Sequence, residues 1–276
     1  MIPTNLIADS VDQLVKAGIA HIRTCGAKTS ARGLSGLQAY NVNYILTNPF
    51  NRVHTLRAPK SIQYFARELL AYCSGSLLAS ELAKAAPMWG NLADKHGNIS
   101  SNYGYYTFYQ KTPDEHSQYE WVASELTKNL DARRCVIVID HIAAKITESK
   151  DIPCTIGMHF FVESGSLSCV VSMRSTDIVT GLPYDMGFYS FVLELLWQDV
   201  RRTHPGLALG YCMVKSNLTQ LYDNREKMAY EDERATPTNP GMPHITNSAA
   251  VLADIYHKTQ ETQTMQWLYT NSNYET

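Results

Sequence analysis

The sequence predicts an α+β protein, because helical patterns come first, strand patterns fill the middle and both kinds mix late in the chain. Helical periodicity covers residues 10–26, a run of β-branched residues starts at Cys135, and mixed patterns follow Gly181. No regular alternation of strand and helix marks βαβ units, which argues against a doubly wound parallel sheet. No Pro/Gly-rich linker divides the 276 residues, so we expect a single domain over residues 1–276.

The first half contributes mainly helices. One helix is predicted between Ser10, a suitable N-cap, and Gly26, a helix stop. Its apolar face consists of Val11, Leu14, Val15, Ile19 and Ile22. Residues 27–59 are rich in Gly, Asn, Ser and Pro, and predict a loop followed by short strands. A second helix is predicted from Ser61, and a third over residues 118–128.

Strands dominate the middle of the chain. Residues 135–139 form a continuous apolar run, which is typical of a strand buried on both faces. Two more strands are predicted over residues 155–162 and 167–173, on either side of a turn at Glu163–Ser166. The later elements are predicted as a long buried helix over residues 186–200, a strand over residues 207–214 and a helix over residues 249–256.

The composition excludes several classes of protein. Apolar residues make up 45% of the chain and charged residues 18%, which excludes intrinsic disorder and fibrous repeats. The net charge of -2 lacks the strong positive field of a nucleic-acid coat or a membrane-surface protein. No apolar run approaches the ~20 residues that span a bilayer, and no signal peptide is recognisable. We therefore expect a cytoplasmic protein with neither nucleic acid nor membrane as a partner.

Cysteine and histidine spacing argues against both disulfides and metals. The six cysteines include no Cys-x-x-Cys pair, and the nine histidines include no His-x-x-x-His pair. The sequence therefore predicts a reducing compartment and no metal site.

Cys154 is the first candidate for chemistry. It follows Pro153 at the start of a predicted strand, where a side chain is rigidly presented. Reactive cysteines need positive surroundings that stabilise the thiolate. Arg133 and Arg134 precede Cys154 in the chain. Arg174 and Ser175 follow the end of the predicted strand at residues 167–173. If the strands pair, these guanidinium groups approach the thiol, and Arg suits phosphate recognition.

These residues belong to an ordered series of motifs that closely resembles the thymidylate synthase superfamily over roughly residues 60–225. The motifs are Arg67-Glu68-Leu69-Leu70, Trp89, Asn102-Tyr103-Gly104, Asp131-Ala132-Arg133-Arg134, Pro153-Cys154, Arg174-Ser175-Thr176-Asp177 and Gly181-Leu182-Pro183-Tyr184-Asp185, with an N-terminal echo at Ala31-Arg32-Gly33. The resemblance implies a large twisted mixed β-sheet flanked by helices. It also implies a homodimer formed through that sheet.

The resemblance assigns a role to each motif residue. Cys154 would add to C6 of a pyrimidine nucleotide, so that C5 can attack the methylene of 5,10-methylenetetrahydrofolate. Glu68 would position water and move protons, and Tyr103 would assist removal of the C5 proton. The phosphate would be bound by Arg32, Arg174 and Ser175, with Arg133 and Arg134 contributed by the partner subunit. The remaining assignments are Trp89, Asp177 and Gly181 to the folate, and Gln220 and Tyr222 to the sugar.

Asp185 departs from the thymidylate synthase pattern, which has Asn at this position. The Asn amide complements the N3–H and O4 edge of uracil, whereas a carboxyl can accept a hydrogen bond from the exocyclic amine of cytosine. Cytosine N3 is an acceptor, so this pairing works best if the Asp or N3 carries a proton. The family's deoxycytidylate hydroxymethylases have the same Asp, which implies dCMP as substrate. The competing interpretation is a helix N-cap Asp with no role in base choice.

Two further departures bear on the product and the sugar. Residues 270–276 are polar, whereas thymidylate synthases close on folate with an apolar tail, so water rather than hydride is expected to complete the reaction. The expected product is 5-hydroxymethyl-dCMP, as in a phage that modifies its cytosine; the location would then be the host cytoplasm. Gln220-Leu221-Tyr222 replaces the family's His-x-Tyr, which leaves CMP open as substrate. A cytidylate methyltransferase using hydride and a non-enzymatic nucleotide-binding relative also stay open.

Overall fold

A mixed eight-stranded sheet runs through the computed structural model, which describes residues 3–30, 33–145 and 149–273. The strands are β1 (Thr4–Ala8), β2 (Ala27–Thr29), β3 (Gly36–Leu46), β4 (Val136–Val138), β5 (Thr155–Glu163), β6 (Ser166–Met173), β7 (Thr176–Asp177) and β8 (Ala208–Tyr222). Their order is β1-β3-β8-β6-β5-β4, with β2 paired to β3 and β7 to β8. The pairs β1–β3, β6–β8 and β7–β8 are parallel and the others antiparallel, which confirms the predicted α+β class.

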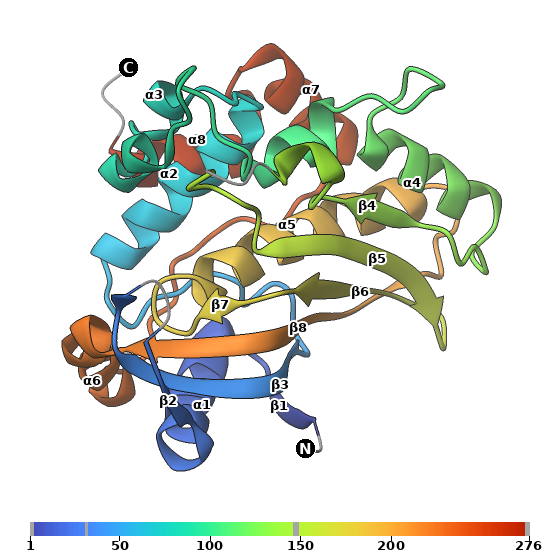
Figure 1. Ribbon diagram of the computed structural model, residues 1–276. Helices are drawn as coiled ribbons and strands as arrows, with labels where there is room; N and C mark the ends of the chain where they lie inside the picture. Colours follow the sequence, from blue (N-terminus) through green and yellow to red (C-terminus); the bar gives the residue numbers. More distant parts are fainter. Residues whose placement is uncertain (1–2, 31–32, 146–148, 274–276) are drawn as a thin grey trace.

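Helices cover one face of this sheet. They are α1 (Val11–Cys25), α2 (Lys60–Ser74), α3 (Ala79–Leu82), α4 (Gln118–Lys128), α5 (Leu182–Val200), α6 (Glu226–Arg234), α7 (Ser248–His257) and α8 (Gln263–Ser272). Helices α1 and α5 contact each other and both pack on the sheet, so they lie on the same face (Figure 1). Helix α2 packs against α5, α7 and α8, and α6 packs against α1.

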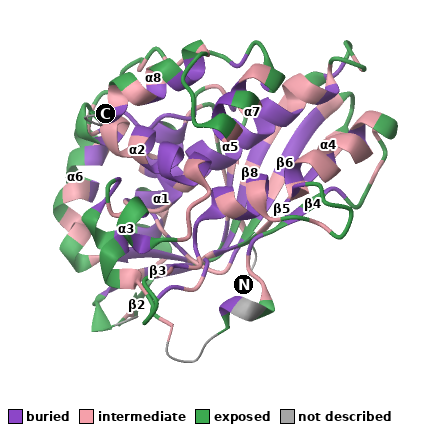
Figure 2. Cartoon of the chain, turned by 90° about the horizontal axis from the view of Figure 1, so that it is seen from above, coloured by how far each residue is buried: buried purple, intermediate pink, exposed green. Residues whose placement is uncertain are grey.

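The helix predictions are largely confirmed. Ser10 caps α1, since its Oγ accepts a hydrogen bond from the N–H of Gln13, and Gly26 follows the last turn. Helix α4 has the predicted bounds, and Ser117 and Glu120 form a capping box at its start. Helix α5 extends the predicted buried helix and lies at the centre of the molecule (Figure 2). Among the described helices, none is long and apolar enough to cross a membrane.

The strand at residues 135–139 differs from its prediction. Strand β4 lies at the edge of the sheet and pairs only with β5. Ile137 is buried, but Val136 is 38% exposed and Val138 47% exposed, so the expectation of burial on both faces is wrong. A β-branched run indicates a strand, whereas its position in the sheet decides whether one face or two are covered.

Other strands are longer than predicted. Residues 27–59 contain one short strand, β2, and then β3, which has 11 residues. Strand β8 has 15 residues and continues to Tyr222. Strands β3 and β8 pair antiparallel over most of their length. The sequence prediction also lacked β1, α6 and α8. Polar residues interrupt the apolar periodicity of these segments, so the sequence pattern did not predict a strand or a helix there.

The C-terminal segment is also more ordered than expected. Residues 270–272 form the end of α8 rather than a free polar tail, while residues 274–276 lie outside the described part. Ser272 is buried, and its carbonyl oxygen accepts a hydrogen bond of 2.6 Å from Nε of Arg67 on α2. The described end of the chain is therefore fastened to α2. The single-domain organisation stays a prediction, supported by one hydrophobic cluster that draws residues from Val11 to Leu268.

Candidate active site

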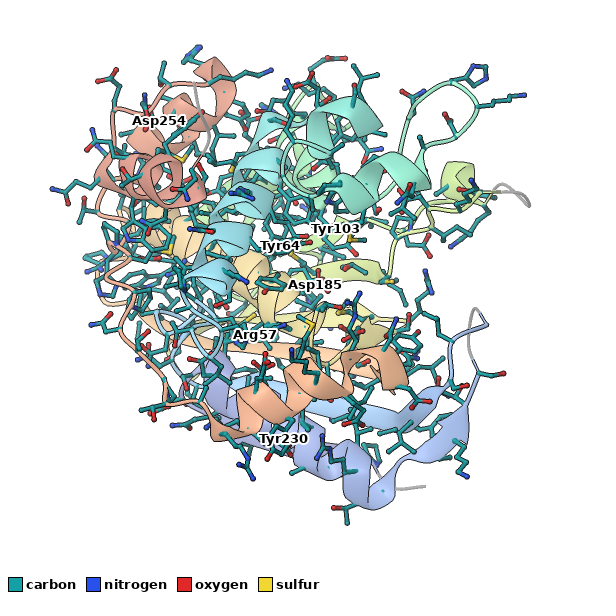
Figure 3. All side chains as sticks on the ribbon, turned by 90° about the vertical axis from the view of Figure 1, so that its left-hand side faces the viewer. Arg57, Tyr64, Tyr103, Asp185, Tyr230 and Asp254 are labelled. Atoms are coloured by element: carbon teal, nitrogen blue, oxygen red, sulfur yellow. The ribbon has the colours of Figure 1, made fainter. Side chains whose placement is uncertain are left out.

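A cavity of about 1120 Å³ lies between α2, the start of α5, α6 and the segment before β5. Figure 3 shows Tyr64, Tyr103 and Asp185 close together, with Arg57 near them and Tyr230 on α6. Six of the predicted site residues line this cavity: Glu68, Trp89, Tyr103, Cys154, Gly181 and Asp185. The cavity therefore gathers candidates that are more than 100 positions apart in the sequence.

Cys154, Ser175 and Arg174 come together as expected from strand pairing. The expectation that Arg133 and Arg134 also approach the thiol is wrong for their own chain, because they precede Val136, which pairs with His159, five residues beyond Cys154. The Ser175 hydroxyl donates to Cys154 Sγ at 3.7 Å, and Nη1 of Arg174 donates to the same hydroxyl at 3.2 Å. The guanidinium is also anchored on the backbone carbonyls of Pro153 at 2.9 Å and Ile152 at 2.7 Å. These bonds hold a positive charge beside the half-buried thiol, which is the environment of a reactive cysteine.

A second cavity of about 610 Å³ opens beside Arg174. Lys145, Ser149, Lys150 and Ile152 complete its lining, and the last two also line the larger cavity. The two cavities therefore share a wall next to Cys154. Because Arg and Lys side chains meet there with a hydroxyl, this region is suited to hold an anionic group such as a phosphate.

Glu68 and Tyr64 are four residues apart on α2, so both face the cavity. The Tyr64 hydroxyl donates a hydrogen bond of 2.9 Å to Oε1 of Glu68. Burial raises the pKa of Glu68 to about 7, although the bond from Tyr64 favours the charged form. Such a carboxyl can take up and release a proton near neutral pH.

Asp185 faces Glu68 from the first turn of α5. The N-cap of this helix is Gly181, and no side chain caps it, so the competing interpretation of Asp185 as an N-cap residue is wrong. Burial raises the pKa of Asp185 well above its usual range, and the charge of Glu68 raises it further. The cavity wall thus contains two carboxyl groups that disfavour simultaneous ionisation.

Tyr103 completes the group around the thiol. Its ring stacks on Tyr72 of α2, with ring centroids 5.3 Å apart and an interplanar angle of 23°. The next residue is Gly104, where a Cβ would lie 2.0 Å from the carbonyl oxygen of Tyr72, so only glycine permits this approach. Burial raises the pKa of Tyr103 well above its usual range, and nearby Asp185 and Cys154 raise it further, which keeps the phenol protonated.

Asp151 ties the segment of Tyr103 to the segment of Cys154. Its Oδ2 accepts hydrogen bonds from the backbone N–H groups of Ser100 at 2.6 Å and Ser101 at 2.9 Å, and its Oδ1 accepts from the Ser101 hydroxyl. Tyr103 is two residues after Ser101, and Cys154 is three residues after Asp151. The buried carboxylate therefore fixes the position of Tyr103 relative to Cys154.

Of the three residues assigned to the folate, two line the cavity and one does not. Trp89 and Gly181 line the cavity, and Nε1 of the buried Trp89 indole has no hydrogen-bond partner among the described residues. Asp177 is outside the cavity lining, and its Oδ1 accepts from the backbone N–H groups of Val179 at 2.7 Å and Thr180 at 2.9 Å. Asp177 therefore shapes the loop that presents Gly181, and its contact with folate stays a prediction.

Four other predicted residues lie away from the cavity of their own chain. Arg133 and Arg134 are exposed at the turn before β4, where Arg134 pairs with Glu125 at 2.5 Å. Gln220 is buried on β8, and its amide donates to Gln38 at 2.9 Å. Tyr222 ends β8 and is half-buried outside the cavity lining. Arg32 lies outside the described residues.

The sequence interpretation missed Tyr64, Asp151, Arg57 and Tyr184, which all line the cavity. Tyr64 had a usable signal, since it lies one helical turn before Glu68. Asp151 had none, because its partners are 50 positions away in the sequence. Among the described residues, no group of three or more His, Cys, Asp or Glu side chains could hold a metal ion.

The amino-acid sequence is similar to those of known proteins of one family. A model of the thymidylate synthase family matches residues 10–263. The deoxycytidylate 5-hydroxymethyltransferase of Enterobacteria phage T6 is 26% identical over 178 residues, covering 63% of this chain and 69% of the relative. The phage T4 protein of the same name is 27% identical over 173 residues, covering 61% and 67%. A thymidylate synthase of Buchnera aphidicola (strain APS) is 27% identical over 217 residues, covering 78% of both chains.

Substitution Asp151→Ala is expected to free the segment of Tyr103. Loss of the carboxylate leaves two backbone N–H groups without their acceptor, at a cost of about 1–3 kcal/mol. Hydrogen exchange measured by mass spectrometry should become faster at Ser100 and Ser101. The matched control is Asp94→Ala, since Asp94 accepts from His96 and Asn98 in an exposed turn. Unchanged exchange at residues 100–101 in the Asp151 variant would contradict this role.

Substitution Glu68→Gln is expected to stabilise the protein at high pH. The folded-state pKa of about 7 lies above the ordinary 4.5, so the folded chain holds the Glu68 proton longer than the unfolded chain. Wild-type stability should therefore fall between these two pH values, by on the order of 3 kcal/mol, and Gln removes this loss. Urea unfolding of both proteins at pH 5 and pH 8 measures the effect. A stability difference that is the same at both pH values would refute it.

Proposed function

Since the chain belongs to the thymidylate synthase family, we propose that it is a deoxycytidylate 5-hydroxymethyltransferase that uses 5,10-methylenetetrahydrofolate. The family match and the named relatives support a one-carbon transferase acting on pyrimidine nucleotides. The proposal adds the base, the product and the roles of the residues in the cavity. The observation that carries it is a half-buried carboxyl, Asp185, that lines one cavity together with Glu68 and Cys154.

Asp185 supports cytosine because its raised pKa favours the protonated form. A neutral carboxyl can donate a hydrogen bond to cytosine N3 and accept one from the N4 amino group. Uracil has a donor at N3 and an acceptor at O4, so it is mismatched while the carboxyl proton stays on the oxygen that faces N3. Each unpaired buried polar group costs about 1–3 kcal/mol, which is enough to select the base.

Cys154 is proposed as the nucleophile that adds to C6 of the pyrimidine. Arg174 and Ser175 would bind the phosphate, because both lie within hydrogen-bonding reach of each other beside the thiol. Arg32 is proposed as a third phosphate ligand. Tyr103, kept protonated, would organise the proton transfer from C5.

The cavity is large enough for a second molecule beside the nucleotide. Its volume of about 1120 Å³ exceeds the range of about 300–1,000 Å³ of pockets that hold one drug-sized ligand. Apolar and aromatic residues in the lining suit a flat ring system: Leu56, Met88, Trp89, Leu92 and Met228. When bound, the folate supplies the carbon that is joined to C5. Trp89 and Gly181 would form its binding surface, with Asp177 as a proposed additional contact.

Polar groups beside Glu68 support water as the final reactant. Ser61 lies on the same face of α2, and its buried Oγ has no hydrogen-bond partner among the described residues. Ser61 could hold one water near the start of α2, and the hydrogen-bonded pair Tyr64 and Glu68 could hold another, since both residues line the cavity. The Glu68 carboxylate would orient this water and accept its proton as the hydroxymethyl group forms.

A homodimer through the open face of the sheet is part of the proposal. A row of partly exposed residues crosses that face in register: Val136, His159, Val170, Met213 and Ile45. Arg133 and Arg134 are exposed beside β4 and do not line the cavity of their own chain. We therefore propose that they bind the phosphate in the partner subunit. Gln220 and Tyr222 remain the proposed sugar contacts.

Product analysis tests the reaction. Wild-type protein incubated with methylenetetrahydrofolate and a mixture of dCMP, CMP and dUMP should yield 5-hydroxymethyl-dCMP, identified by mass spectrometry, without dihydrofolate. Cys154→Ser should form no product. Turnover of dUMP alone would refute the cytosine assignment, and CMP as the better substrate would favour the ribonucleotide enzyme. Dihydrofolate release would favour methyl transfer, and the absence of any product would favour a nucleotide-binding protein.

Substitution Asp185→Asn is expected to shift base preference toward dUMP. The amide presents a donor to O4 and an acceptor to N3–H of uracil, so the ratio of kcat/KM values for dCMP and dUMP should fall on the order of 100-fold. Asp199→Asn on the same helix is the matched control, because Asp199 pairs with Tyr119 outside the cavity. An unchanged ratio in the Asp185 variant would exclude base selection by this residue.

A further inference from the structure

We propose that Tyr64 is a positioning residue that assigns the proton shared by Glu68 and Asp185 to Asp185 and leaves Glu68 as the carboxylate. The inference deepens the proposed function and rests on it, because the proposed hydrogen bond from Asp185 to cytosine N3 needs a proton on Asp185. It gives Glu68 and Asp185, which line the same cavity, different tasks. Pairs of acids whose surroundings differ in this way divide acid and base roles in enzymes.

The contacts of Tyr64 favour the charged form of one carboxyl only. Its hydroxyl donates a hydrogen bond of 2.9 Å to Oε1 of Glu68. The ring is fixed by Tyr184, with ring centroids 4.4 Å apart at an interplanar angle of 55°. Because burial raises its pKa and keeps the Tyr64 phenol protonated, it acts as a permanent donor to Glu68.

Asp185 has no matching donor. Among the described residues, no side chain donates a hydrogen bond to its carboxyl, and Glu68 supplies a like charge nearby. The titratable neighbours of the pair are Tyr64 and Tyr72 on α2, Tyr184 and Tyr189 on α5, Tyr103, and Cys154. The carboxyls Asp151 and Glu231 and the cations Arg57, Lys60, Lys150, Arg225 and Arg234 line the same cavity.

This asymmetry decides where one shared proton resides. With both carboxyls in a low-dielectric wall, ionising the second is costly, so one proton is retained near neutral pH. The hydrogen bond from Tyr64 stabilises the negative charge on Glu68. No such bond stabilises the charged form of Asp185, which desolvation and the charge of Glu68 both disfavour. Glu68 is thereby available to accept a proton from water, and Asp185 is available to donate to cytosine N3. One hydroxyl thus links base recognition to the proton transfer step.

The test is the titration of both carboxyls in Tyr64→Phe. Phenylalanine keeps the ring contact with Tyr184 and removes only the donor. With 13C-labelled Asp and Glu carboxyls, assigned through Glu68→Gln and Asp185→Asn, the variant should raise the apparent pKa of Glu68 by about one pH unit and lower that of Asp185. Tyr119→Phe is the matched control, because Tyr119 donates at 3.0 Å to Asp199 away from the cavity. It should leave both titrations unchanged.

Binding without folate gives a second readout. At pH 7, Tyr64→Phe should reduce the preference for dCMP over dUMP about 10-fold, measured by calorimetry. A Glu68 titration that does not move in Tyr64→Phe, or that moves equally in Tyr119→Phe, would overturn the inference. If the titrations shift as expected while no cytosine nucleotide binds wild type, the proton assignment stands and the proposed function fails.

Discussion

The close approach of α2 to two neighbouring segments is the constraint on which the cavity depends. At Gly187 on α5, a Cβ would lie 2.5 Å from the Phe65 ring of α2, and at Gly104 it would lie 2.0 Å from the backbone of Tyr72. Hydrogen atoms at these two positions let α2 lie against both segments. The contact brings Glu68 opposite Asp185 and beside Tyr103, so a larger residue at either glycine would separate the groups.

Burial on this scale gives the site its electrostatic character. Four carboxyls and several phenols line one cavity, and desolvation raises the pKa of Glu68, Asp185 and Tyr103. In water these groups would differ little from free side chains. The site also contains one fixed positive charge next to the thiol, since Arg174 is anchored on two carbonyl groups. A neutral acid and a cationic pocket can therefore exist within one small volume.

The sequence predicted those elements and contacts that follow from a local pattern of residues. Helices α1, α4 and α5 were predicted closely because their apolar residues repeat at helical spacing. Strand β8 was only half predicted, and its pairing with β3 could not be anticipated. Cys154, Arg174 and Ser175 could be brought together by reasoning from strand pairing. Asp151 could not, since its role depends on a loop that folds back from 50 positions away.

The sequence by itself determined the α+β class, the family relationship and the residue types available for chemistry. Those properties are local, because a residue type and its spacing are fixed by the chain alone. Only the tertiary structure decided that Glu68 and Asp185 share one wall, that Tyr64 donates to the first and not the second, and that Gln220 points to Gln38. Protonation state depends on distance and solvent exclusion, and both arise only when distant segments pack together.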